Sequence, residues 1–154
     1  MNAIHQNRTT SNGQTSNDGL PQRQEGTTSN DTIDAQTLAM FCGTENYYNL
    51  GPLLKNSLIT DGVHYLMTHG LAWLVTDALA VVVTRALHDG FWSITFTPSA
   101  DGSGDLVITD GNELEIHRQH YARHAYPLPK PLRLFAVFTD IERPRWLAML
   151  ASEY

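Results

Sequence analysis

The fold is decided by one stretch, LAWLVTDALAVVVTRALH at residues 71–88, which is apolar around most of a helical circumference. Its polar positions Thr76, Thr84 and His88 leave only a narrow stripe for solvent. A helix with so little polar surface is covered on several sides. We therefore expect residues 71–88 to form the central helix of the core, ended by Asp89-Gly90.

This apolar stretch is a poor membrane span. Asp77 and Arg85 interrupt it, and an ionised Asp in mid-helix costs about 2.5–3.5 kcal/mol in a bilayer. The segment Met1–Thr10 lacks the apolar region of a signal peptide. Cys42 is the single cysteine, so no internal disulfide points to an oxidising compartment. We expect a soluble cytoplasmic protein that does not enter a membrane.

Two further helices are predicted before the central one. Asp34 can accept hydrogen bonds from the first amides of a short helix that runs to Met40. Thr60 or Asp61 is the expected N-cap of the next helix, and Gly70 fits its C-terminal stop. The apolar residues of that helix fall at helical spacing: Val63, Leu66 and Met67.

The chain after Gly90 predicts strands. Aromatic and β-branched residues gather in segments separated by turn signals, of which Asp110-Gly111-Asn112 is a hairpin signal. The predicted strands are Phe91–Thr97, Leu106–Ile108, Leu114–Tyr121, Leu132–Thr139 and Trp146–Leu150. A helix over 145–152 remains an alternative for the last segment. Helices followed by strands predict an α+β fold, with two or three N-terminal helices packed on a four- to five-stranded antiparallel sheet.

Composition divides the chain into two parts. Residues 1–33 are rich in Asn, Gln, Ser, Thr and Gly, and such a segment buries too little apolar surface to offset its chain entropy. We expect a disordered polar tail at 1–33 and a single α+β domain at 34–154.

The charge of the chain argues against general nucleic-acid binding. The formal net charge is −6, whereas phosphate neutralisation needs clustered Lys and Arg. A group of acidic residues stands just ahead of a basic stretch, and these acids are the candidate binding residues: Asp101, Asp105, Asp110, Glu113 and Glu115. Ordinary solvated strand edges, which commonly carry charge, are the alternative interpretation.

A first candidate for chemistry is the set Asp61, His64 and Asp77. Asp61 and His64 are three residues apart on a predicted helix, where a carboxylate can orient an imidazole as a general base. Asp77 falls in the buried helix, where an unpaired charge is costly. This hypothesis predicts contact between Asp77 and His64 or Glu45. The alternative is that Asp61 caps its helix while Asp77 pairs with a Tyr, Trp or Arg of the core.

A second candidate is a metal site at His117, His120 and His124. On a helix these residues would share one face and could bind zinc, whereas on a strand His117 points away from the other two. Cys42 follows an aromatic residue and is expected in the core rather than as a nucleophile. The chain has neither a phosphate loop nor a dinucleotide fingerprint, so no cofactor is predicted.

Several residue groups resemble one bacterial family. The groups are F-x-G-T-E-x-Y-Y at 41–48, T-D-G-V-x-Y-L at 60–66, W-L-x-x-D-A at 73–78, Asp110-Gly111-Asn112, Gln119, Tyr126-Pro127-Leu128 and Ser152-Glu153-Tyr154. In this combination the chain resembles DUF6876, an uncharacterised family, over about residues 40–154. The resemblance implies one small soluble domain of a kind often encoded on mobile genetic elements, and it implies no chemical activity.

These observations favour a non-catalytic protein-binding module of a mobile genetic element. One version is an inhibitor that presents the acidic residues to a host nucleic-acid-processing system. The first alternative is a small hydrolase or transferase that uses Asp61, His64 and Asp77. The second is a structural homo-oligomer built through the last hairpin.

Overall fold

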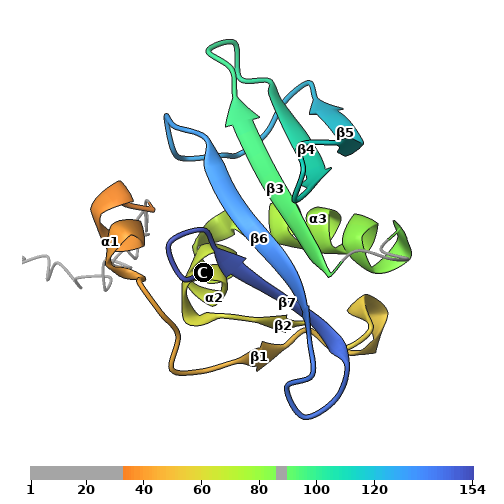
Figure 1. Ribbon diagram of the computed structural model, residues 1–154. Helices are drawn as coiled ribbons and strands as arrows, with labels where there is room; N and C mark the ends of the chain where they lie inside the picture. Colours follow the sequence, from red (N-terminus) through yellow and green to blue (C-terminus); the bar gives the residue numbers. More distant parts are fainter. Residues whose placement is uncertain (1–32, 86–89) are drawn as a thin grey trace, which may run out of the picture.

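A computed structural model describes residues 33–85 and 90–154, in which one sheet packs against a long broken helix (Figure 1). The helical elements are α1 (Ala35–Met40), a 3-10 turn (Pro52–Leu54), α2 (Asp61–Leu66), a π-helical segment (Met67–Leu71) and α3 (Ala72–Arg85). The strands are β1 (Tyr48–Asn49), β2 (Leu58–Ile59), β3 (Phe91–Pro98), β4 (Gly104–Asp110), β5 (Glu115–Tyr121), β6 (Leu132–Thr139) and β7 (Arg145–Leu150).

The sheet has seven strands in the order β1-β2-β7-β6-β3-β4-β5. Neighbours pair antiparallel except β2 and β7, which run parallel with Leu58 opposite Leu147. A parallel pair needs a crossover connection. Here the chain leaves β2 through the long helix and four further strands before it returns as β7.

The predicted fold class is therefore wrong in three respects. The sheet has seven strands instead of four or five, and it is mixed instead of antiparallel. The helices are not all N-terminal to it, because β1 and β2 precede α2. Each of these strands has only two residues, which is too short to show an alternating pattern. The pairing partner of β2, β7, also lies far away in sequence.

The long helix is continuous from Asp61 to Arg85 except for a break at His69 and Gly70. Gly70 has φ +96°, a conformation that L side chains rarely adopt, which confirms the predicted stop. By length and composition Asp61–Arg85 is apolar enough to cross a membrane. In this fold its apolar residues pack into the core, where Leu66, Leu71 and Val75 are fully buried.

The two faces of the sheet differ. One face packs on the helices through residues that alternate along β3 and β6: Trp92, Ile94, Phe96, Leu132, Leu134 and Ala136. On the other face a smaller cluster is formed by Leu58, Leu147 and Met149, flanked by Phe135, Val137 and Ile141. No helix in the described ranges contributes to this second cluster. We call the face of the sheet that carries this cluster the helix-free face (Figure 1).

Replacement of Gly70 tests the helix break. Gly70→Ala is expected to lower the free energy of unfolding by about 1–2 kcal/mol, because Ala resists a positive φ. Gly70→Asn should cost less, since Asn tolerates this region better. Chemical denaturation of both variants measures the difference. Equal stability of Gly70→Ala and wild type would contradict the assigned backbone conformation.

Candidate binding surface

The carboxylate of Asp61 organises the segment that leads into β1. Its Oδ2 accepts from the backbone amides of Glu45 (2.8 Å) and Asn46 (3.0 Å), and its Oδ1 accepts from the hydroxyl of Tyr48 (3.0 Å). The Asn46 and Glu45 amides hold the pKa of the Asp61 carboxyl well below its ordinary value. Asp61 is thus an anchor for the loop at 44–48.

The predicted acid–base residues fall into two separate groups. The ring of Tyr48 stacks on His64 with centroids 3.9 Å apart, so Tyr48 links His64 to Asp61. Asp77 accepts a hydrogen bond from the Tyr121 hydroxyl of β5 at 2.9 Å. Burial and this carboxylate raise the pKa of Tyr121. Within the described ranges, Asp77 shares no hydrogen bond with His64 or Glu45.

The pH dependence of stability tests the Asp61 anchor. Because the pKa of Asp61 is lowered by folding, its carboxylate stabilises the fold above about pH 4, and this contribution is lost as the pH falls. We expect Asp61→Asn to melt below wild type at neutral pH and the two melting temperatures to converge towards about pH 2. Thermal unfolding followed by circular dichroism measures this. Asp140→Asn, at an exposed carboxylate, controls for loss of one charge. A difference in melting temperature between wild type and Asp61→Asn that stays constant with pH would contradict the stabilising role of the Asp61 carboxylate.

A second carboxylate holds the start of α2. Glu153 accepts from the Gly62 amide through Oε1 (3.0 Å), and from the Thr60 hydroxyl (2.6 Å) and the Leu150 amide (2.9 Å) through Oε2. Thr60 is the N-cap, as predicted, but its side chain does not cap. Glu153 supplies the negative charge that a helix start favours. The C-terminal segment is thereby tied to α2.

Gly62 leaves the space that Glu153 occupies. A Cβ on Gly62 would collide with the Leu150 side chain and lie 2.8 Å from Glu153 Oε2, whereas one on Gly43 would meet nothing. We expect Gly62→Ala to lower the free energy of unfolding by about 1–3 kcal/mol through overpacking. The control Gly43→Ala should change it little. Urea denaturation of both variants distinguishes them, and similar stabilities would refute the close approach.

Of the three histidines proposed for metal binding, His120 and His124 have separate hydrogen-bond partners. His120 Nδ1 lies 2.8 Å from Asp105 Oδ1. His124 accepts from the Tyr126 amide at Nδ1 (3.1 Å), so its Nε2 donates to the Ser103 carbonyl (2.7 Å). His117 Nε2 is buried and has no hydrogen-bond partner among the described residues. No group of three possible metal-binding side chains occurs within residues 33–85 and 90–154.

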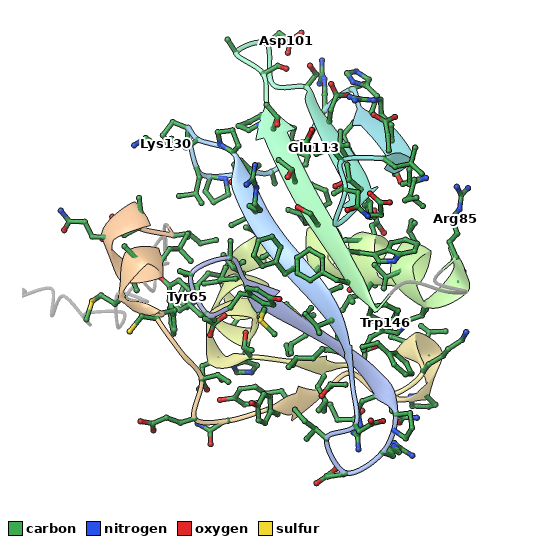
Figure 2. The ribbon with its side chains drawn as sticks, in the orientation of Figure 1. Tyr65, Arg85, Asp101, Glu113, Lys130 and Trp146 are labelled. Atoms are coloured by element: carbon green, nitrogen blue, oxygen red, sulfur yellow. The ribbon has the colours of Figure 1, made fainter. Side chains whose placement is uncertain are left out.

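The five acidic candidates lie on the β3–β4 and β4–β5 hairpins. Asp101 and Asp110 accept from nearby amides within their own turns. Asp105 pairs with His120 and Glu115 with Arg118. Figure 2 shows Asp101 at the tip of the β3–β4 turn; Glu113, which belongs to the β4–β5 turn, is labelled lower in the view. Most of this acidic charge is thus engaged within the hairpins.

The helix-free face carries an aromatic cluster made by Phe91, Phe135 and Tyr154. The centroid of Tyr154 lies 5.4 Å from that of Phe91 and 5.3 Å from that of Phe135. Tyr154 is 73% exposed. A depression of about 390 Å³ beside the cluster is lined by Phe91 and Phe135 together with Arg133, Asp110 and Glu113.

The edge strand β1 has a depression on each face. The one on the helix side has a volume of about 600 Å³ and is lined mainly by Tyr48, Leu50, Ile59, His64 and Met67. The one on the helix-free side has about 410 Å³ and includes Tyr47, Asn49, Glu45, Glu142 and Arg145. Arg145 is only 5% exposed, and it donates to Glu142 at 2.8 Å.

Sequence reasoning missed several of these features. It expected Cys42 in the core, whereas Cys42 is exposed. It selected neither the edge at Tyr47–Asn49 nor the buried Arg145. A basic residue at the start of an apolar strand gives no signal of burial. The exposed Tyr47 and Asn49 could be recognised only once β1 is placed at the sheet edge.

One comparison with known proteins gives a match. Residues 32–154 match the family model described as "Family of unknown function (DUF6876)". No curated protein and no solved structure matches significantly. The match covers the whole described part of the chain.

Proposed function

The chain belongs to the DUF6876 family, and we propose that it is a non-catalytic protein-binding module of a mobile genetic element, with a protein partner in the cytoplasm. One observation carries this proposal: the helix-free face displays the cluster Phe91, Phe135 and Tyr154 beside charged groups. Aromatic side chains supply much of the binding energy at protein interfaces. A charged rim around an apolar centre is the usual arrangement there.

The titratable groups support a non-catalytic role. The acid–base hypothesis needs a carboxylate to orient His64 as a general base, but within the described ranges the His64 ring stacks on Tyr48 and shares no hydrogen bond with Asp61 or Asp77. Both oxygens of Asp61 and both of Glu153 already accept hydrogen bonds from the chain, and Asp77 accepts one from Tyr121. These carboxylates are used to hold the fold.

The inhibitor version of this function assigns the contact to the acidic residues. Glu115 is paired with Arg118 and Asp105 is hydrogen-bonded to His120, so these two acids are already engaged with other side chains of the hairpins. Glu113 and Asp110 line the depression beside Phe91. We therefore place the contact on the helix-free face, with these two acids at its rim.

Capture of the partner tests this function. Tagged wild-type protein is incubated with lysate of its host, and bound proteins are identified by mass spectrometry. Tyr154→Ala is expected to reduce the recovery of a stoichiometric partner by about tenfold, as for an aromatic hot spot. Leu53→Ala is the matched control, because Leu53 is also exposed (87%) and lies in the 3-10 turn outside this face. Its recovery should equal that of wild type.

Three outcomes contradict the proposal in different ways. Equal loss in both variants would remove the helix-free face as the contact. Loss after neutralising Asp101, Asp105 and Glu115, with normal recovery by Tyr154→Ala, would favour the acidic hairpins instead. Recovery of only the protein itself, with a concentration-dependent mass in light scattering, would favour the homo-oligomer.

A further inference from the structure

The edge strand β1 presents unused backbone hydrogen-bonding groups. Tyr48 lies opposite Ile59 and the Leu50 amide donates to Ser57 (3.0 Å). In an antiparallel pair, alternate residues direct their backbone groups towards the partner strand and away from it. Since Tyr48 and Leu50 face β2, the N–H and C=O groups of Tyr47 and Asn49 face outwards. Both residues are exposed within the described fold.

Strand β1 and the residues just before it are held in place by the Asp61 carboxylate at the start of α2. Asp61 accepts hydrogen bonds from Glu45, Asn46 and Tyr48, which immediately precede or form β1. A segment fixed in its extended form loses little entropy when another strand binds to it. The edge is therefore preorganised.

The two depressions beside β1 match the alternation of an added strand. Successive side chains of a strand point to opposite faces. Side chains at the level of Tyr48 would enter the depression on the helix side, between Leu50 and Met67. Side chains at the level of Tyr47 and Asn49 would enter the depression on the helix-free side.

The two depressions differ in chemistry. The helix-side depression is lined by aliphatic and aromatic groups, with the stacked pair Tyr48 and His64. The other has the exposed acid Glu45 at its rim. Glu142 is also exposed but is paired with the buried Arg145, so Glu45 is the acid that can meet a basic side chain. An apolar side chain suits the first, and a basic side chain suits the second.

We propose that an extended peptide of the protein partner adds to β1 as an eighth strand, with apolar and basic residues in alternation. This inference rests on the proposed binding function and names the partner's chemistry. β-Strand addition of this type takes affinity from main-chain hydrogen bonds and specificity from pockets for alternate side chains. The helix-free depression at β1 borders the face that we assign to the partner, through Leu58.

The opposite edge of the sheet, β5, is protected against the addition of a strand. On β5 the Arg85 guanidinium donates to the Ile116 carbonyl (3.1 Å), and the pairing with β4 is irregular at Ile108/Thr109. Charged side chains, Glu115 and Arg118, also line β5. Covered carbonyls, bulges and edge charges are the features that prevent strand pairing. In β1 the described residues show no bulge and no covered carbonyl; its short length of two residues is the feature that limits strand pairing there.

A peptide titration tests the proposal. The probe is a fluorescent peptide, Ser-Lys-Leu-Lys-Leu-Lys-Ser, measured by anisotropy. Tyr47→Pro removes the outward N–H at the edge, whereas Tyr47→Ala keeps it and serves as the matched control. Tyr47→Pro should bind the peptide about tenfold more weakly than Tyr47→Ala, as expected for loss of a main-chain hydrogen bond and closer pairing. The same peptide with Glu in place of Lys should bind about tenfold more weakly to wild type.

Hydrogen exchange gives a second measurement that does not depend on a substitution. The amides of Tyr47 and Asn49 should exchange rapidly in the free protein and about tenfold more slowly with peptide bound, whereas the amides of β5 should not change. Equal affinity of Tyr47→Pro and Tyr47→Ala, protection confined to other strands, or no binding of the Lys peptide would overturn the proposal. If Tyr47→Pro still captures the natural partner while Tyr154→Ala does not, strand addition fails and the binding function stands.

Discussion

The fold depends on how the first turn of α2 is held. Two carboxylates converge there from opposite directions in the sequence: Asp61 accepts from the loop at 44–48, and Glu153 accepts from Gly62 and Thr60. Charge-assisted hydrogen bonds of this kind are about twice as strong as neutral ones. They place α2 against the end of β7, which allows β2 to pair with β7 in parallel. Without them, two-residue strands would have little to hold them in the sheet.

The same arrangement brings together three of the distant residue groups on which the resemblance to the family was based. Phe41–Tyr48 supplies the donors for Asp61, Thr60–Leu66 supplies both Asp61 and the space at Gly62, and Ser152–Tyr154 supplies Glu153. Each group is incomplete alone, since a carboxylate without its donors would be destabilising in a part-buried position. The groups are therefore one structural unit in this fold.

Much of the central fold follows from sequence periodicity, and the edge does not. β6 begins and ends at the predicted residues, Leu132 and Thr139, because an eight-residue strand with a buried face has a clear pattern. Asp34 also caps α1 as expected. β1 and β2 escaped prediction because two residues show no period, and their pairing depends on tertiary contacts with β7. Asp61 was selected for its spacing to His64, but its chemistry is set by loop amides, which no side-chain pattern reveals.

The two edges of the sheet, β5 and β1, differ in how accessible they are to another strand, and this difference bears directly on binding. A mixed sheet that leaves an edge open risks unspecific pairing, and here β5 is protected by Arg85 and its own charges. Pairing at β1 is limited by its length of two residues, and the strand has neither a covered carbonyl nor a bulge within the described residues. The backbone of β1 is preorganised by Asp61, and depressions of different polarity lie on its two faces. An edge that is both rigid and chemically differentiated discriminates between peptides, because a strand shifted by one residue exchanges its apolar and basic side chains between the two depressions.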